Sequence, residues 1–389
     1  MTAFGTPPDM PRTLVVTGHF PPETGGVQTF TWEFLRRLPP RQLVVVAPHW
    51  AGDAAFDAGL GFPVIRRHGY LLFRHLRRIV REHRLQAGWI TAMAPFGLYA
   101  PLVRRAGIQR LVVSTHGQEL GWLRAAPTRV ALGLMARPVD VLTYLSAVTR
   151  TALEPVVGRR TELAQLAGGT DPTQFRPGHG GAALRVRYGF GDDPVVVCVG
   201  RLVRRKGYDV LRQAWPDVVA AVPTARLLIV GDGPMRDELT RWARTRPAGQ
   251  VRVTGPVPEA ELAAHYDAGS VFLLACRDDR HGLQTEGLGL SVLEASASGL
   301  PVVVGRSGGS AEAVRDGVTG TLIDARRPDA LTAALVALLN DAELRASYGQ
   351  AGRAWVSARF SWDAGARRLA ALLSAAPRPM AGVEDEAGP

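Results

Sequence analysis

Short runs of apolar, mostly β-branched residues recur along the chain and alternate with segments of helical periodicity. The runs are continuous instead of alternating in polarity, which is typical of parallel strands covered on both faces. They are Leu14–Thr17, Leu43–Ala47, Gly88–Ala92, Leu111–Thr115, Val141–Leu145, Val195–Val199, Leu227–Val230, Val251–Thr254, Val271–Ala275 and Val302–Val304. Segments of helical period lie between them, for example Leu211–Val222 and Ala330–Leu339. The pattern predicts an α/β protein with doubly wound parallel sheets.

Glycine and proline cluster between Leu166 and Gly178, between the two sets of strands. A chain of 389 residues is long enough for two domains. We therefore expect one domain over residues 1–168 and a second over 169–360. A helix follows over 361–376, and the tail over 377–389 is expected to be disordered.

The composition narrows the class of protein. With 46% hydrophobic and 21% charged residues, the bulk of the chain is not disordered. The two cysteines, Cys198 and Cys276, each lie in an apolar run, which argues against a disulfide framework and for reduced thiols in a cytosol. No uncharged apolar run reaches the ~18 residues that span a bilayer, and the first twelve residues lack the pattern of a secretory signal. We expect a cytoplasmic protein.

Positive charge is concentrated in the first half. Residues 1–170 hold 20 arginines and 10 acidic residues, whereas residues 171–389 hold 26 basic and 25 acidic residues. A basic half favours an anionic partner, such as nucleic acid, anionic lipid or a phosphorylated substrate, although compositional drift toward arginine is an alternative. Basic and aromatic residues are not interleaved on a recognisable binding element, so we expect no nucleic-acid partner.

One predicted helix, Tyr70–Leu85, carries much of this charge. It combines an apolar stripe, which includes Leu76 and Ile79, with five arginines off that stripe: Arg74, Arg77, Arg78, Arg81 and Arg84. The helix either packs its stripe in the core and leaves a solvated basic face, or binds a membrane surface. Core packing of the stripe and binding to a membrane are compatible if the arginines face anionic headgroups. The protein is then peripheral to the inner face of the membrane.

The loops that follow the strands are the place to look for a site, because ligands bind beyond the carboxyl ends of an open parallel sheet. These loops are rich in glycine and polar residues, and those of the two domains are expected to face each other across a cleft.

The segment Gly200–Gly207, GRLVRRKG, places Arg201 and Lys206 directly after a predicted strand. Lys206 is the only lysine in the chain, beside 45 arginines. A compact ammonium group kept at one place suggests that a planar guanidinium does not fit there. Two cations beside a glycine loop suit an anion such as a diphosphate, and a solvated basic turn is the alternative.

The segment Glu286–Glu294, EGLGLSVLE, spaces two carboxylates eight residues apart, with the second in a helix that opens near Leu290. Amides at the start of that helix, made accessible by Gly287 and Gly289, are suited to phosphate oxygens. Carboxylates accept hydrogen bonds from sugar hydroxyls. The segment therefore indicates a binding site for the ribose of a nucleotide and for a second sugar. The alternative is that it has no ligand and that the two residues are simply a loop glutamate and a solvated helix glutamate.

Two features of the first domain are weaker signals. Thr24–Phe30, TGGVQTF, is a glycine turn that opens a helix and either approaches the same phosphate or is only a tight turn. His116 ends a strand beside Gly117, where a catalytic and a structural histidine are both possible. No spacing predicts a hydrolase triad or a zinc site, so no metal and no cofactor is expected.

At these motifs the chain resembles the retaining glycosyltransferases of family 4, which have the GT-B architecture. The shared segments are PPETGGVQ, GRLVRRKGYD, LLIVGDGP, the Glu286–Glu294 segment, EASASGLPVVVGRSGGSAEAV and AGRAWV. Within the family, HGQELGW, DVLTYLS and TEGLGLSVLEA are most similar to the actinobacterial GDP-mannose-dependent phosphatidylinositol mannosyltransferases.

The resemblance implies two facing Rossmann-like domains, the first binding the acceptor and the second the donor, with the last helix crossing back to the first. It implies transfer of a hexose, mannose, from GDP-mannose to an acceptor hydroxyl such as that of a phosphatidylinositol mannoside glycolipid, without a metal. Open alternatives are another nucleotide sugar with a secondary metabolite or polysaccharide as acceptor, and a nucleotide-sugar epimerase.

The resemblance also implies roles for individual residues. Arg201 and Lys206 contact the donor diphosphate, Glu294 the ribose and Glu286 the transferred sugar. The rest of the donor site comprises Gly26, Gly200, Gly255, Val257, Gly287, Leu288, Gly289 and Leu290, with Gly255 and Val257 along the base. His116 lies beside the sugar and, with Gln28, faces the acceptor. The linker reads AGGTD where relatives have an Asn- or Ser-Gly-Val-Asp pattern, which leaves the role of Asp171 open.

Overall fold

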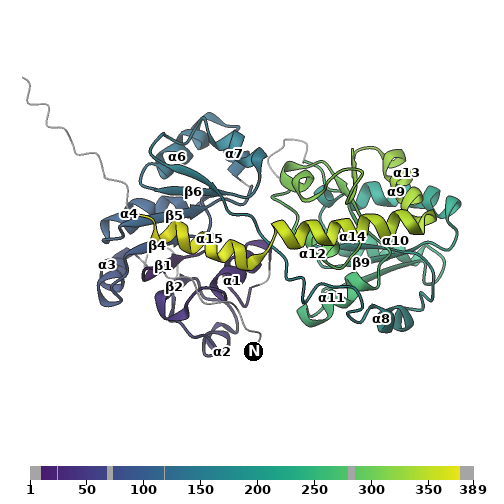
Figure 1. Cartoon of the computed structure of the whole chain (residues 1–389), viewed down its shortest axis with the longest axis horizontal. Helices are drawn as coiled ribbons and strands as arrows, with labels where there is room; N and C mark the ends of the chain where they lie inside the picture. Colours follow the sequence, from purple (N-terminus) through teal and green to yellow (C-terminus); the bar gives the residue numbers. More distant parts are fainter. Residues whose placement is uncertain (1–9, 24, 68–72, 118, 279–284, 377–389) are drawn as a thin grey trace, which may run out of the picture.

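The computed structural model describes residues 10–23, 25–67, 73–117, 119–278 and 285–376. It contains two parallel sheets, each in a separate lobe with its own helices (Figure 1). Of the segments singled out above, Thr24, residues 70–72, Gln118 and the tail predicted to be disordered lie outside the described residues.

The first sheet has seven parallel strands in the order β3-β2-β1-β4-β5-β6-β7. They are β1 (Thr13–Val16), β2 (Leu43–Ala47), β3 (Val64–Arg66), β4 (Ala87–Ile90), β5 (Arg110–Ser114), β6 (Val141–Tyr144) and β7 (Glu162–Gln165). The helical segments between them are α1 (Gly26–Leu35), η1 (Pro40–Gln42), α2 (Asp53–Asp57), α3 (Phe73–Glu82), η3 (Phe96–Tyr99), α4 (Ala100–Arg105), α5 (Glu119–Trp122), α6 (Ala126–Ala136) and α7 (Ala147–Leu153).

The second sheet has six parallel strands in the order β10-β9-β8-β11-β12-β13. They are β8 (Val195–Val199), β9 (Arg226–Val230), β10 (Val251–Gly255), β11 (Val271–Leu274), β12 (Val302–Gly305) and β13 (Gly320–Ile323). Its helical segments are α8 (Gly181–Tyr188), η4 (Arg204–Lys206), α9 (Tyr208–Ala221), α10 (Arg236–Arg244), α11 (Glu259–Asp267), α12 (Leu290–Ala297), η5 (Gly308–Ala313), α13 (Pro328–Asn340) and α14 (Ala342–Arg359). The last helix of the described residues is α15 (Trp362–Ser374).

All ten apolar runs form strands, and the predicted fold class is confirmed. Alternate residues of β1 enter different cores: Val15 packs with Phe34 of α1, whereas Leu14 and Val16 pack with Leu76 of α3. Both faces are therefore covered, which is why the strands read as continuous apolar runs.

Three strands were not predicted from the sequence, namely β3, β7 and β13. All three lie at the edge of a sheet. The sequence ELAQ of β7, for example, is partly buried at three of its four positions. An edge strand has a neighbour on one side only and tolerates polar residues, so it lacks the apolar run that identifies a central strand.

The composition led us to expect unpaired cysteines in apolar surroundings and no membrane-spanning segment. Cys198 and Cys276 are buried free thiols. Within the described part of the chain, none of the helices combines the length and the hydropathy needed to span a bilayer.

The last two helices connect the domains. α14 lies on the second domain, the chain crosses at Phe360, and α15 packs on the first domain (Figure 1). Trp362 of α15 meets the rings of Phe30 and Phe34 at centroid distances of 6.1 and 5.5 Å. The main chain of Arg110 belongs to β5, and its Nε donates to the Leu372 carbonyl at 2.9 Å. The helix thus completes the first domain's core.

The two crossings between the domains lie side by side. The Thr170 amide, in the linker that follows β7, donates to the Phe360 carbonyl at 2.8 Å. A Cβ at Gly169 would come within 2.9 Å of that carbonyl oxygen and within 2.6 Å of the Trp362 nitrogen. Only a residue without a side chain permits this approach, so the linker and the start of α15 form one paired hinge.

We expect Trp362→Ala to destabilise the first domain by about 3–5 kcal/mol, because it leaves a cavity against Phe30 and Phe34. The change is measured by urea unfolding followed by near-ultraviolet circular dichroism. Trp50, which is 40% exposed, provides the matched control. Trp50→Ala is expected to cost at most about 0.5 kcal/mol. Equal losses in the two variants would contradict the docking of α15.

Candidate active site

Glycines form a row at the carboxyl ends of three adjacent strands. Gly200, Gly231 and Gly255 lie at the ends of β8, β9 and β10. The Gly200 amide donates to Val230, and the Gly231 amide donates to Gly255, both at 3.0 Å. A Cβ on Gly231, whose φ is 135°, would lie 2.0 Å from the Gly200 carbonyl oxygen. The row therefore presents backbone rather than side chains, and partly buried Val257 follows it.

An ion cluster lies in the loop that follows β8, beside Gly200. Glu286 Oε2 is 2.8 Å from Lys206 Nζ and 2.8 Å from an Arg205 guanidinium nitrogen. The Lys206 and Glu286 side chains are only 10% and 11% exposed. Two segments 80 residues apart in sequence are therefore joined by ion pairs, and the two cations exceed the one carboxylate by a single positive charge. Lys206 and Glu286, both predicted from the sequence, lie together.

The ionisation of Glu286 follows from its two partners. Burial alone raises the pKa of the Glu286 carboxyl, but the charges of Lys206 and Arg205 outweigh it and hold the pKa below its ordinary value. Glu286 is thus a carboxylate at neutral pH, and its oxygens only accept hydrogen bonds.

Arg205 was not singled out from the sequence, whereas Arg201 was. The Arg201 side chain is exposed and has no partner among the described residues. The single turn of η4 turns Arg205 and Lys206 toward the same carboxylate. The run of three cations, Arg204 to Lys206, was the available signal, but it does not tell which arginine points inward.

The loop after Glu286 leads into α12 as predicted, with the helix beginning at Leu290. The Glu286 amide donates to Ser307 Oγ at 3.2 Å, and its carbonyl accepts from the Gly309 amide at 2.9 Å. Leu288 is buried, and Gly289, at φ 84°, precedes the helix. The Val292 amide donates to the Gly289 carbonyl at 2.8 Å, so the Leu290 and Ser291 amides are the ones at this helix start that remain for an anion.

Glu294 lies one turn into α12, partly buried, and it was predicted. Its Oε2 accepts a hydrogen bond of 2.6 Å from the Tyr266 hydroxyl, a partner that the sequence did not indicate. Burial raises the pKa of Glu294 to about 7, although the Tyr266 hydrogen bond acts in the opposite direction. Near neutral pH this carboxyl is therefore divided between its protonated and ionised forms.

His116 follows β5 in the first domain. Its Nε2–H donates to the Thr91 carbonyl at 2.6 Å, which leaves Nδ1 as a hydrogen-bond acceptor. Burial lowers the pKa of His116 to about 4, so the ring is neutral at physiological pH. The amides of His116 and Gly117 both donate to Glu119 Oε2 at 3.0 Å. Glu119, not recognised from the sequence, positions this loop.

The two domains touch at this point. A Cβ on Gly287 would lie 2.8 Å from the His116 carbonyl oxygen, and one on Gly309 would lie 2.6 Å from Ser146 Cβ. The loop of His116 therefore lies directly against the loop that carries Glu286. The prediction that strand-end loops of both domains face one another agrees with this contact.

The remaining predicted residues lie at the start of α1. Gln28 is buried, and its Nε2 is 3.5 Å from His19 Nδ1. Gly26 is exposed, and no described atom lies within 4 Å of the position of a Cβ there. This helix start is open to a ligand. Among the described residues, no group of three or more His, Cys, Asp or Glu is arranged to hold a metal ion.

Two parallel-sheet domains that meet at their strand-end loops form the two-domain architecture called GT-B. Residues 183–355 match the family model described as glycosyl transferases group 1. Curated glycosyltransferases that are 36–41% identical over more than nine-tenths of the chain show that it belongs to this family.

Relatives match almost the whole chain. It is 41% identical, over 93% of its length and 98% of the relative, to the GDP-mannose-dependent alpha-(1-6)-phosphatidylinositol monomannoside mannosyltransferase of Mycolicibacterium smegmatis. It is 36% identical, over 94% of its length and 99% of the relative, to the GDP-mannose-dependent monoacylated alpha-(1-6)-phosphatidylinositol monomannoside mannosyltransferase of Corynebacterium glutamicum. The fold matches Anabaena Alr3699/HepE in complex with UDP, with a TM-score of 0.77, 19% identity and coverage of 93% and 99%.

We expect the Glu294 carboxyl to titrate with a midpoint near pH 7, and Tyr266→Phe to move the midpoint upward, because the phenol hydrogen bond favours the ionised form. The titration is followed by NMR of protein labelled with carboxyl-¹³C glutamate, and the signal is assigned by its loss in Glu294→Gln. A midpoint near 4.5 in the unmodified protein would contradict the burial of this carboxyl.

Proposed function

We propose that this glycosyltransferase moves a mannosyl group from GDP-mannose to a hydroxyl of a phosphatidylinositol monomannoside, with retention of the anomeric configuration. The observation that carries the proposal is identity of 36–41% over more than nine-tenths of the chain with relatives named for that donor and acceptor. The ion cluster and the glycine row supply a site of matching chemistry.

The donor diphosphate is expected to lie against the end of β8. When the bond between the sugar and the diphosphate breaks, negative charge grows on the diphosphate. Lys206, the exposed Arg201 and the first amides of α12 then stabilise that charge, and fixed charges lose little free energy to reorganisation. Glu286 holds Lys206 in place and accepts hydrogen bonds from hydroxyls of the transferred sugar.

The nucleoside is expected to extend from there along the glycine row. Glu294 accepts from the ribose hydroxyls, and Gly255 and Val257 lie along the base. The acceptor approaches from the first domain, past Gly26 and Gln28. Neutral His116 presents Nδ1 as an acceptor to a sugar hydroxyl, since its Nε2 proton is already bound to Thr91.

We propose further that transfer needs no divalent metal. Support comes from three cationic side chains in the loop after β8, Arg201 directly after the strand and Arg205 and Lys206 on η4. Fixed cations perform the charge neutralisation that a metal supplies in other transferases.

The function is tested by incubating the protein with GDP-mannose and phosphatidylinositol monomannoside, with and without EDTA. The expected result is an α-linked dimannoside product, formed at the same rate in both. Transfer only from another nucleotide sugar, or only to a soluble acceptor, would overturn the donor or the acceptor assignment. Isomerisation of GDP-mannose without acceptor would favour an epimerase, and inhibition by EDTA would contradict the metal-free proposal.

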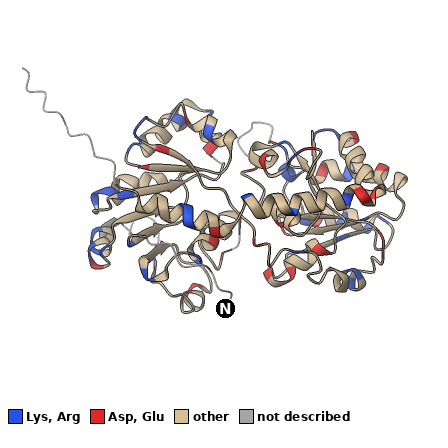
Figure 2. Cartoon of the chain, in the orientation of Figure 1, with Lys and Arg blue, Asp and Glu red and all other residues tan. Residues whose placement is uncertain are grey.

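Association with a membrane surface belongs to the same proposal. In α3, Leu76, Ile79 and Val80 are at most 5% exposed, so the apolar stripe lies in the core and not in lipid. Arg77 and Arg78 are exposed. Basic positions also lie on the neighbouring α4 of the first domain (Figure 2). Exposed apolar side chains on the same domain include Leu98, Val130 and Leu134. A basic surface with apolar side chains suits the inner, anionic face of a membrane, where a glycolipid acceptor resides.

We expect Lys206→Ala to lower kcat by roughly 100- to 1,000-fold, the effect of removing one preorganised charge contact worth ~2.7–4 kcal/mol. Arg204→Ala, which changes an exposed cation two residues away, is the matched control and keeps activity near that of the unmodified enzyme. Thermal unfolding checks that both variants are folded. Unchanged kcat in folded Lys206→Ala would remove the ammonium group from the mechanism.

Combined Arg77→Ser, Arg78→Ser and Arg81→Ser is expected to weaken binding to vesicles of anionic lipid on the order of a hundredfold, since each cation near the surface contributes ~1 kcal/mol. Co-sedimentation with vesicles measures the change. The control replaces three exposed arginines of the second domain, Arg241, Arg244 and Arg326, by serine. Equal binding by both triple variants would rule out α3 as the contact.

A further inference from the structure

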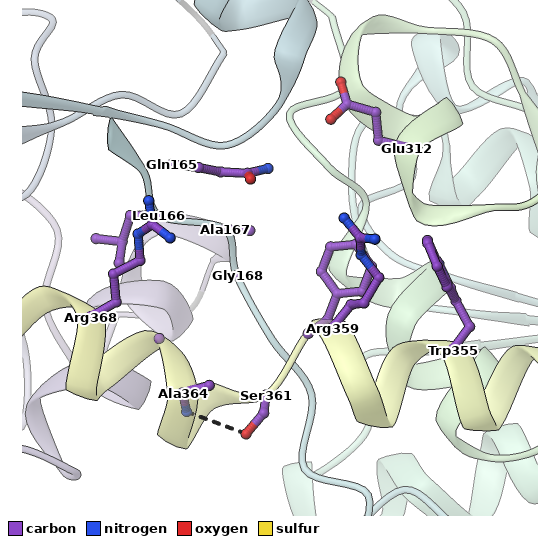
Figure 3. A pocket seen from close by; sticks show the side chains of 12 residues that line it. Gln165, Leu166, Ala167, Gly168, Glu312, Trp355, Arg359, Ser361, Ala364 and Arg368 are labelled. Atoms are coloured by element: carbon purple, nitrogen blue, oxygen red, sulfur yellow. Dashed lines mark hydrogen bonds between the residues drawn. The ribbon is translucent and has the colours of Figure 1, made fainter. Parts of the chain in front are cut away.

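A cavity of about 480 Å³ lies at the paired hinge, where the chain crosses between the domains (Figure 3). Its walls come from the end of β7 and the linker, from η5, and from the adjoining ends of α14 and α15. Ligand pockets typically enclose 300–1,000 Å³, so the volume suits a small metabolite. None of its lining residues belongs to the ion cluster or to the glycine row.

Two arginines face this cavity. Arg359 ends α14 and Arg368 lies in α15, and both extend from the helices toward Gln165 (Figure 3). Within the part of the chain that the structure describes, neither guanidinium has an ion-pair or hydrogen-bond partner. A guanidinium presents two parallel N–H groups that match the oxygens of a phosphate. Figure 3 shows the two guanidinium groups on opposite sides of the cavity, so one of them is available for a phosphate and the other for a polar group at the far end of the ligand.

Arg359 is held in position before any ligand arrives. Its guanidinium carbon lies 4.6 Å from the centroid of the Trp355 ring, which also lines the cavity. Stacking on an aromatic ring favours one orientation of the guanidinium and reduces the entropy lost when a ligand binds.

The opposite wall carries a carboxylate. Glu312 of η5 faces the cavity, and one of its oxygens accepts from the Val148 amide at 3.4 Å. An ionised carboxylate accepts hydrogen bonds from hydroxyl groups, and it repels a second phosphate. Gly168, Ala364 and Gly365 line the space without filling it. The wall therefore suits the hydroxyl end of a ligand whose other end is phosphorylated.

We infer that this hinge cavity binds a small soluble sugar phosphate or polyol phosphate, its phosphate on Arg359, a hydroxyl on Glu312 and its far end toward Arg368. The inference does not depend on the proposed donor or acceptor. Arg368 lies on the first domain, whereas Arg359 and Glu312 lie on the second. A ligand between them favours one orientation of the domains and so changes nucleotide affinity, and the nucleotide changes the affinity for the ligand by the same factor.

The test is thermal unfolding of the full chain in saturating GDP, titrated with glucose 6-phosphate, with inorganic phosphate and with glucose. We expect a saturable rise of Tm with glucose 6-phosphate, a weaker response to phosphate and none to glucose. Combined Arg359→Gln and Arg368→Gln should weaken the apparent affinity about tenfold or more, because two charged hydrogen-bonding groups are lost. Arg367→Gln, an exposed neighbour on α15 outside the cavity, should respond like the unmodified protein.

Glu312→Gln should reduce the advantage of glucose 6-phosphate over inorganic phosphate. The titration is repeated in Lys206→Ala without GDP, so that its outcome does not depend on the donor site. The absence of a saturable response, or an equal response from the double arginine variant, would overturn the hinge site. If GDP itself fails to raise Tm, the proposed donor is contradicted. The hinge site is still tested, because the titration without GDP does not depend on the donor.

Discussion

The site depends on one buried charge arrangement, the Glu286 carboxylate between Lys206 and Arg205. Charges removed from water are tolerated in a protein only when they are paired and hydrogen-bonded. The pairing is possible because β8 and β11 are parallel neighbours, so η4 and the loop before α12 both lie at the carboxyl ends of the strands of the second sheet. The rest of the site is arranged around this cluster: glycine-lined strand ends on one side, the amides of α12 on another, and the His116 loop of the first domain against Gly287.

Much of this could be predicted from the sequence, because the relevant signals are local. Central strands were recognisable as apolar runs, and Lys206 stood out as the single lysine among arginines. Glu286 and Glu294 were recognisable because a glycine-rich loop and a helix start lie between them.

The partners of these residues were not predictable, because they depend on tertiary contacts. Tyr266 reaches Glu294 from α11, 28 residues earlier in the chain, and nothing in the sequence around it marks that contact. Arg205 differs from Arg201 only in the direction that one turn of η4 gives it. The apolar stripe of α3 is equally compatible with lipid and with a core, and only its packing under α4 decides between them. The hinge cavity has no sequence motif, since it is built from three separate segments.

The return of α15 to the first lobe has a consequence for biosynthesis. The second lobe is, in connectivity, an insertion within the first, because the segments before Gly169 and after Phe360 belong to the same body. On the ribosome, the inserted lobe is complete while the surrounding lobe still lacks Trp362 against Phe30 and Phe34. Maturation therefore runs against the order of translation: the part synthesised first is the last to close its core.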